Sequence, residues 1–422
     1  MKHRLAALGA CLVLLSPLAA AEEWPEWRGP RRDGSSLETG LALRWSETEN
    51  VAWRTPIPGK GHSSPIVWGH RLFVTTAEPG ELRRILLCLD ARGGKLLWSR
   101  DVLVAPLEKI NHLNSYASST PATDGKHVFV AFQDRGEMFV ACYDFEGNKV
   151  WEQRPGKFFA AHGFCSSPLL YQDLVILNGD QDSRPQGPAY LVALDKATGA
   201  QRWLAPRPAG VRSYVPPVLF DAAGRKQLIL SGSASVASYD PDTGKQLWIV
   251  DGPTEQMAAS LVMTQGIVFV TGGFPTLHLM GIRPDGEGNV TKTHVLWHEP
   301  RNPKAVSYVP SPLAFKDWFF VVSDGVVGGG AHASCLEAKT GKIVWTEKLG
   351  RHHSASPVLA DGHIYWPDDD GITYVTKAGP TFELVAKNAI PDQCFASFAI
   401  SRGRIYIRGL KQLWCIGAGR RE

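Results

Sequence analysis

The sequence lacks several features that point to common protein classes. Its 422 residues contain no low-complexity tract, no linker between domains and no helical period long enough to define a helix. The formal net charge is only +4, and Lys2 and Arg4 supply half of it. Such a balance gives no indication of binding to nucleic acid or to a membrane surface. With 44% hydrophobic and 20% charged residues, the chain is globular and large enough for one large β architecture.

Sequence signatures of familiar active sites are also missing. We find no nucleophile elbow, no phosphate-binding loop, no CxxC pair and no two adjacent cysteines. Gly328-Gly329-Gly330 is typical of a hairpin tip, because no helix that could bind a phosphate follows it. No nucleophile and base occur at a meaningful spacing. These absences favour a binding protein over an enzyme.

Residues 1–21 have the composition of a secretory signal peptide. A basic start, Lys2 to Arg4, precedes an apolar run from Leu5 to Leu18 and a possible cleavage site after Ala21. A membrane anchor needs about 20 apolar residues, and Cys11 lies inside the apolar run instead of at a lipoprotein cleavage site. We therefore expect a periplasmic or secreted protein without a membrane span, released by cleavage near Ala21.

What the sequence does contain is a repeat that ends in tryptophan. An apolar strand end, an acidic residue, a turn with glycine and a second strand closing on tryptophan recur as LDARGGKLLW, LDKATGAQRW, YDPDTGKQLW and LEAKTGKIVW. The shorter YDFEGNKVW has the same form, and before Trp297 the hairpin has swollen into residues 283–294. Steps of 45 to 53 residues separate the tryptophans at 53, 98, 151, 203, 248, 297 and 345. This period is slightly above the ~40–45 residues of a propeller blade.

Counting the repeats predicts an all-β, eight-bladed propeller of four-stranded antiparallel blades. Eight small, mostly proline-containing segments precede the innermost strands, from Ser64-Pro65 to Ala396-Ser397, because side chains have least room at the axis. The seventh repeat has Phe382-Glu383-Leu384 in place of its tryptophan. The strand ending at Trp53 lacks three partners, and three short strands between Phe395 and Gly417 lack a fourth. We expect the N-terminal strand to complete the C-terminal blade, so that no sheet edge stays exposed.

The A-x-D-x-x-T-G-x-x-x-W pattern, present as VALDKATGAQRW and ASYDPDTGKQLW, resembles the repeat of the PQQ-like (quinoprotein-type) eight-bladed propellers. The resemblance covers Asn50 to Gly417 and includes the BamB-like group of outer-membrane assembly subunits. It implies that the tryptophans pack between neighbouring blades. The organisation is then a leader at 1–21, an ordered arm lying on the propeller at 22–46, and the propeller at 47–422.

Six cysteines remain after the leader. Cys88, Cys142, Cys335 and Cys415 occupy the same position of the repeat, and equivalent sites on different blades lie too far apart for a disulfide. We interpret them as buried thiols. Cys165 and Cys394 both lie in loops of one face, and whether they pair stays open.

The loops of one propeller face carry most of the histidines. Two kinds of loop lie on this face: the loop from the outermost strand of one blade to the innermost strand of the next, and the loop between the second and third strands of each blade. A polar or anionic ligand could bind in an axial funnel at this face, and the structural alternative is that these side chains hydrogen-bond the loops. The predicted ligand-binding residues are His62, Tyr116, His162, Arg212, Tyr214, Gln256, Tyr308 and His353. The same loops carry Asn114, Cys165, Asp182, Glu255, His278, His352, Asp368, Asp369 and Asp370.

Neither metal pattern of this face is complete. A site from His62, His162 and His353 needs three blades to converge, and Pro367-Asp368-Asp369-Asp370-Gly371 lacks the alternating ligands of a calcium loop, so we interpret it as a turn. We expect no metal and no catalytic residue. The favoured hypothesis is an exported, monomeric scaffold that binds an envelope or extracellular protein or a glycan. The alternative is a quinoprotein-like oxidoreductase with PQQ and calcium in the funnel.

Overall fold

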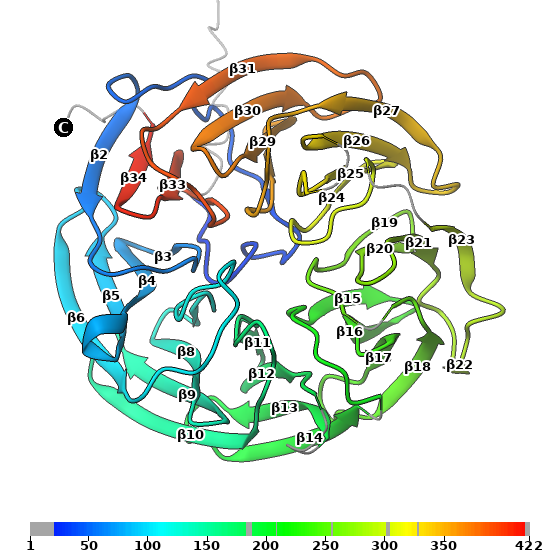
Figure 1. The fold of residues 1–422 in the computed structure, drawn as a ribbon, viewed down its shortest axis with the longest axis horizontal. Helices are drawn as coiled ribbons and strands as arrows, with labels where there is room; N and C mark the ends of the chain where they lie inside the picture. Colours follow the sequence, from blue (N-terminus) through cyan, green and yellow to red (C-terminus); the bar gives the residue numbers. More distant parts are fainter. Residues whose placement is uncertain are drawn as a thin grey trace, which may run out of the picture.

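The computed structural model describes residues 21–182, 188–207, 209–254, 256–300, 304–326 and 329–417. Eight antiparallel sheets surround a central axis, so the predicted all-β, eight-bladed propeller is confirmed (Figure 1). Within these ranges, no helix is long and apolar enough to cross a membrane. Of the predicted leader, residues 1–20 lie outside the described residues, as do Glu255 and Gly328 of the loops.

Each blade runs from an innermost strand at the axis to an outermost strand at the rim. A 3₁₀ turn, η1 (Pro79–Glu81), joins two strands of blade 1. The strands of the first four blades, from the axis outward, are β3 (Ile66–Trp68), β4 (Arg71–Glu78), β5 (Arg83–Asp90) and β6 (Leu96–Val104); β7 (Ala122–Thr123), β8 (His127–Asp134), β9 (Glu137–Asp144) and β10 (Lys149–Lys157); β11 (Leu169–Tyr171), β12 (Leu174–Gly179), β13 (Ala189–Asp195) and β14 (Gln201–Arg207); β15 (Val218–Ala222), β16 (Arg225–Gly232), β17 (Ser235–Tyr239) and β18 (Gln246–Asp251).

Blades 5 to 8 repeat this order. Their strands are β19 (Val262–Thr264), β20 (Ile267–Gly272), β21 (His278–Ile282) and β23 (Val295–Pro300); β24 (Leu313–Phe315), β25 (Trp318–Val322), β26 (His332–Glu337) and β27 (Ile343–Lys348); β28 (Val358–Ala360), β29 (His363–Pro367), β30 (Ile372–Lys377) and β31 (Leu384–Ala389); β32 (Ala399–Ser401), β33 (Arg404–Arg408), β34 (Gln412–Ile416) and β2 (Val51–Pro56).

The ring closes through the two ends of the chain. Strand β2 pairs antiparallel with β34, with Trp53 opposite Cys415 and Arg54 opposite Trp414. In Figure 1 the blue β2 lies on the outer side of the red β34 and β33. The predicted completion of the C-terminal blade by the N-terminal strand is therefore confirmed, and β34 gains the partner that an edge strand lacks.

The repeated tryptophan and the repeated glycine meet at the joint between blades. Gly199 in the turn of blade 3 has φ +73, and a Cβ there would lie 2.7 Å from the indole of Trp151 in blade 2. The same turn has an Asp195 carboxylate that accepts the backbone N–H groups of Ala197 and Thr198. Glycine is thus required twice, for its backbone conformation and for the space that the neighbouring indole fills.

The indole N–H of most of these tryptophans also bonds the next blade. Six of them donate to a backbone oxygen in the turn of the following blade, at 2.9–3.1 Å: Trp53 to Ala91, Trp98 to Phe145, Trp151 to Lys196, Trp203 to Pro241, Trp297 to Ala338 and Trp345 to Gly379. The packing of tryptophan between blades that the family resemblance implies is observed at these joints.

The joint between blades 4 and 5 is built differently. Part of the swollen hairpin of blade 5 forms β22 (Gly288–Asn289), which pairs parallel with β18 at the outer edge of blade 4. The indole N–H of Trp248 donates instead to the Gln227 side-chain oxygen of its own blade, at 2.7 Å. The insertion therefore replaces the usual turn contact and covers an exposed sheet edge.

The prediction that Phe382 replaces the tryptophan of blade 7 is wrong. Val375 takes the place in β30 that Cys335 takes in β26, and Val375 pairs with Ala386 where Cys335 pairs with Trp345. Phe382 lies before β31, in the connection from β30, and packs edge-on against Trp345. The sequence misled because this connection is longer than in the sister repeats, which shifts the register.

A tryptophan from the N-terminal arm fills the space beside Ala386. The ring centroids of Trp45 and Tyr365 lie 6.2 Å apart, and Trp98 and Phe73 of blade 1 are separated by 5.9 Å at the equivalent strand position. Trp45 is 4% exposed and belongs to the same apolar cluster as Ala386. Its backbone N–H donates to Asn388 of β31. The arm thus supplies the aromatic ring that blade 7 lacks.

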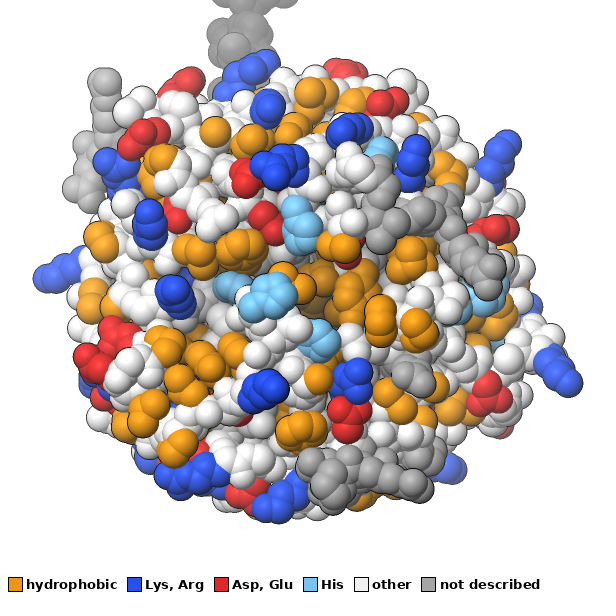
Figure 2. Space-filling view, viewed as in Figure 1, with side chains coloured by type: hydrophobic (Ala, Val, Ile, Leu, Met, Phe, Trp, Pro, Cys, Tyr) orange, Lys and Arg blue, Asp and Glu red, His pale blue; other side chains and the backbone are white. Residues whose placement is uncertain are grey.

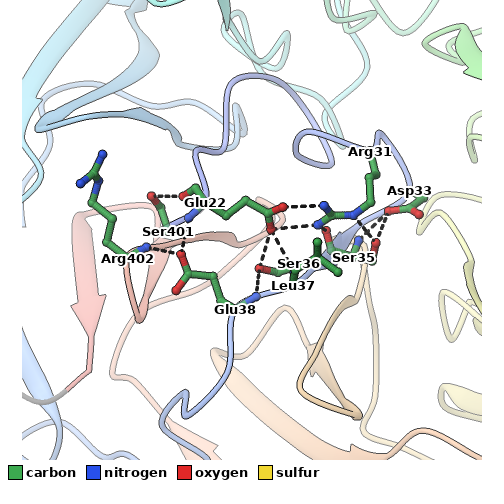
Figure 3. Close-up of polar contacts among 9 residues, drawn as sticks. All are labelled: Glu22, Arg31, Asp33, Ser35, Ser36, Leu37, Glu38, Ser401 and Arg402. Carbon is green, nitrogen blue, oxygen red and sulfur yellow. Dashed lines mark hydrogen bonds and ion pairs between the residues drawn. The ribbon is translucent and has the colours of Figure 1, made fainter. Parts of the chain in front are cut away.

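The rest of the arm closes the axis from the face opposite the funnel. Glu38 accepts the backbone N–H groups of Arg402 and Gly403 in blade 8, and Glu22 pairs with Arg31 within the arm (Figure 3). Strand β1 (Ser35–Ser36) adds to β28 of blade 7 at the axis. Further hydrogen bonds reach the innermost segments of blades 1, 2, 3 and 6, at Val67, Thr123, Leu170 and Ser311. In Figure 1 the blue segment crosses the centre of the ring.

The described cysteines all carry free thiols. Cys88, Cys142, Cys335 and Cys415 are completely buried, as expected for their shared position in the third strand. Burial raises the pKa of Cys88 to about 11, so its thiol stays protonated at neutral pH. Cys165 and Cys394 are unpaired as well.

We expect Trp45→Ala to lower the free energy of unfolding by about 3–5 kcal/mol, because it leaves a cavity beside Tyr365. Adding Ala386→Trp to this variant should recover part of the loss, whereas in the intact chain the same substitution overpacks the joint. Denaturant unfolding measures both effects. Leu37→Ala, on the same arm but 72% exposed, is the matched control and should change stability by less than about 0.5 kcal/mol. Equal losses for Trp45→Ala and Leu37→Ala would contradict the role of Trp45.

Candidate functional site

A cavity of about 490 Å³ opens at the axis on the histidine-rich face. Its walls come from the loops that lead into the innermost strands and from the connections between second and third strands. Figure 2 shows histidine and apolar side chains gathered around the central hollow. The volume lies within the ~300–1,000 Å³ range of small-molecule and side-chain sites. We call this cavity the funnel.

Small hydroxyl residues of the innermost segments contribute to the wall of the funnel, among them Ser64, Thr120, Ser167, Ser356 and Ser397. At five joints the backbone N–H of one innermost segment donates to the hydroxyl of the next blade at 2.9–3.0 Å: Ser64 to Thr120, Thr120 to Ser167, Ser260 to Ser311, Ser311 to Ser356 and Ser356 to Ser397. These bonds satisfy N–H groups that converge at the axis and have no partner in their own sheet. Trp27 of the arm also lines the funnel.

The mouth of the funnel is apolar. Leu113, Phe274, Val309 and Val326 line it and are 67%, 58%, 40% and 70% exposed. These side chains lie in four different connections, β6–β7, β20–β21, β23–β24 and β25–β26. Their gathering therefore results from the fold and not from a local stretch of sequence. Exposed apolar side chains that meet around a concave site mark a surface that another molecule covers.

The structure brings several of the predicted site residues together. His62, Tyr214 and Tyr308 line the funnel. Nδ1 of His162 lies 2.8 Å from the Tyr214 hydroxyl, and Gln256 donates from its amide to the Tyr308 hydroxyl. Arg212 forms an ion pair of 2.9 Å with Asp182. His162 and Gln256 thus hold the two phenol rings in the wall.

Of the eight predicted residues, five are not among those that line the funnel: Tyr116, His162, Arg212, Gln256 and His353. Tyr116 packs in the core between blades 1 and 2, beneath the Arg84 guanidinium. His353 is completely buried, with both ring nitrogens 2.7 Å from backbone carbonyl oxygens of Pro367 and Leu349. Burial lowers the pKa of His353, and these two acceptors oppose the shift. Its neighbour His352 lines the funnel in its place.

His352 forms a pair with a carboxylate at the funnel wall. Its Nδ1 lies 2.5 Å from Oδ2 of Asp369, and the backbone N–H and hydroxyl of Ser354 donate to the same carboxylate. The hydrogen bond with Asp369 raises the pKa of His352. Asp368 accepts the N–H groups of Asp370 and Ile372, which confirms the predicted turn.

His62 has the opposite electrostatic environment. Burial, reinforced by the nearby Arg408 guanidinium, lowers its pKa to about 4. Its ring lies 4.9 Å from that of Phe395. The funnel wall therefore contains one imidazole with a lowered pKa, His62, which is uncharged at neutral pH, and one with a raised pKa, His352.

Sequence reasoning missed the apolar half of the site. Trp27 lies in the arm, which has no repeat, and the only signal was its position in an aromatic WPEWRGP segment. Leu113, Phe274 and Phe395 were missed because only polar residues of the loops were considered. Asp324 lies in a loop that was recognised only by its glycines.

The described side chains offer little chemistry. The Ser354 hydroxyl donates to the Asp369 carboxylate, which also pairs with His352, and among the described residues no hydrogen bond joins this hydroxyl to a histidine. Burial raises the pKa of the Cys165 thiol to about 12, which keeps it protonated. Among the described residues, no three His, Cys, Asp or Glu side chains are close enough to hold a metal ion. The arrangement is suited to holding a ligand.

The fold and its tryptophan joints define an eight-bladed propeller of the PQQ-like type. A family profile described as outer membrane protein assembly factor BamB matches residues 82–234 and 290–379. Because the match covers more than half of the chain, the protein belongs to this family. No curated protein matches the sequence.

Solved structures share the fold at low sequence identity. BamB from Moraxella catarrhalis is 12% identical, with a TM-score of 0.58 over 87% of this chain and 97% of its own. Quinohemoprotein alcohol dehydrogenase from Comamonas testosteroni is also 12% identical, with a TM-score of 0.67 over 95% of this chain and 81% of its own. The computationally designed Ika8 protein is 11% identical, with a TM-score of 0.58 over 92% of this chain and 99% of its own. These likenesses show the fold alone.

The funnel does not match the needs of PQQ with calcium. PQQ is a tricarboxylate, and such an anion requires cations or a bound metal. Of the described residues, those lining the funnel include no lysine or arginine, and their one carboxylate is Asp324. The donor set therefore does not fit this cofactor, and we derive no reaction from it.

Titration should separate the two funnel imidazoles. We expect His352 to titrate above pH 6.5 and His62 near pH 4 in NMR spectra of histidine-labelled protein. Acidification from pH 6.5 towards 4 then lowers stability through His62, because the unfolded chain binds that proton first. The contribution of His352 is present below pH 6.5 and is lost as pH rises through its raised pKa. Asp369→Asn should lower the His352 midpoint, and an unchanged midpoint would contradict the pairing.

Proposed function

We propose that this protein is a non-catalytic, exported scaffold that binds a protein partner at the funnel. The observation that carries the proposal is the ring of exposed apolar side chains at the mouth of a deep axial cavity. An extended segment of a partner can cover these side chains and place one of its own in the funnel. Burying apolar area of this kind contributes roughly 25 cal/mol per Å².

A protein partner fits the rim better than a glycan. Sugar hydroxyl groups lose hydrogen bonds to water on binding and need polar replacements. The rim offers Leu113, Val309 and Val326, which cannot hydrogen-bond through their side chains. Membership in the family of an outer membrane assembly factor supports the same choice.

We place this binding in the periplasm or outside the cell, with the protein acting as a monomer. The composition of residues 1–21, which is typical of a signal peptide, supports export. The BamB family membership is consistent with a location in the cell envelope.

Selection from a displayed library of random peptides tests the proposal. The intact protein should enrich peptides with apolar residues, and Leu113→Asp combined with Phe274→Asp should abolish their binding, because each adds a charge to the surface to be covered. Val344→Asp, at a 41% exposed position on the outer strand β27, is the matched control and should bind normally. A library that yields no enriched peptide, in parallel with a glycan array that yields ligands, would overturn the proposal of a protein partner.

A further inference from the structure

One carboxylate, Asp324, lines the funnel, together with the His352 imidazole, which already pairs with Asp369. No lysine or arginine accompanies Asp324 among the described residues. One of its oxygens accepts the backbone N–H of Val326 at 3.1 Å. The other acids nearby belong to the turn at 368–370, where Asp369 binds His352. The site therefore favours a positive charge over a negative one.

Flat aromatic surfaces line the same cavity as this carboxylate. Five aromatic side chains contributed by the arm and by loops of four blades line the same cavity: Trp27, Tyr214, Phe274, Tyr308 and Phe395. Aromatic faces attract organic cations through the ring quadrupole, by about 0.5–2 kcal/mol for each contact according to desolvation. A carboxylate within an aromatic wall is thus suited to an organic cation with an apolar stem.

We infer that the funnel takes up the side chain of an arginine or lysine from the bound partner segment. The methylene stem lies along the aromatic wall, and the charged end reaches Asp324. The apolar rim holds the residues that flank the basic one. This inference rests on the proposed function and adds the chemistry of the inserted side chain. Charge complementarity selects a basic segment, since an acidic one would bring its carboxylate beside Asp324.

The composition of the selected peptides tests the inference separately from the proposed function. Arginine or lysine flanked by apolar residues should be enriched well above its frequency in the library. Enrichment of apolar peptides without a basic residue would overturn the inference and leave the proposed function intact. Failure to enrich any peptide would overturn both.

A charge replacement in the best selected peptide gives the second readout. Citrulline in place of arginine keeps the size and most donors of the side chain but removes its charge. Norleucine in place of lysine keeps the four-carbon stem and removes the charged ammonium group. We expect the neutral peptide to bind about tenfold more weakly than the basic one, a difference of about 1.4 kcal/mol in binding free energy. High salt should reduce this difference. Isothermal calorimetry measures these affinities.

Asp324→Asn should remove most of this tenfold difference, because the basic and neutral peptides then meet the same uncharged amide. Asp221→Asn is the matched control, since Asp221 lies in the β15–β16 hairpin with its side chain 79% exposed. It should keep the full difference. A difference that survives in Asp324→Asn would contradict the assigned role of the carboxylate.

Discussion

At six of the eight joints a blade is tied to the next by a tryptophan whose N–H group bonds a carbonyl in the turn of the next blade, and at five of them the ring also covers the glycine of that turn. The rest of the structure depends on this joint, because a wedge-shaped sheet cannot bury both faces alone and must pack against two neighbours. The joint explains why acidic residue, glycine and tryptophan recur together. The acid shapes the turn, the glycine leaves the space, and the tryptophan of the preceding blade fills it.

This coupling also explains how much the sequence could reveal. A repeated joint leaves a repeated trace, so the blade number, the strand order and the closure by β2 could all be predicted. At the two deviations the sequence shows that the repeat is altered, but it does not show what replaces the usual contact. At Ala386 the aromatic ring comes from Trp45, which lies about 340 residues away along the chain, so the local sequence does not reveal it. At the joint after blade 4, the side-chain oxygen of Gln227 on another strand accepts the indole N–H in place of a turn carbonyl.

The location of the funnel could be predicted from the sequence, but only some of the side chains that line it could. The strand order assigns each loop residue to one face of the propeller. On this basis His62, Tyr214 and Tyr308 could be predicted at the funnel, where the structure places them. Whether a loop residue points to the axis or into the core depends on irregular backbone, as His352 and His353 show by exchanging the expected roles. Trp27 and the apolar rim become visible only once the arm and the loops are placed in space.

The pairing of β2 with β34 also constrains how the protein is made. Val51 and its partner Ile416 are separated by about 360 residues, so a ribosome releases the first strand of the last sheet long before the other three. Seven blades can form in order of synthesis, but the eighth waits for the end of the chain. Until then β2 and the arm stay without their final contacts, and such a span makes closure the slow, late event of folding.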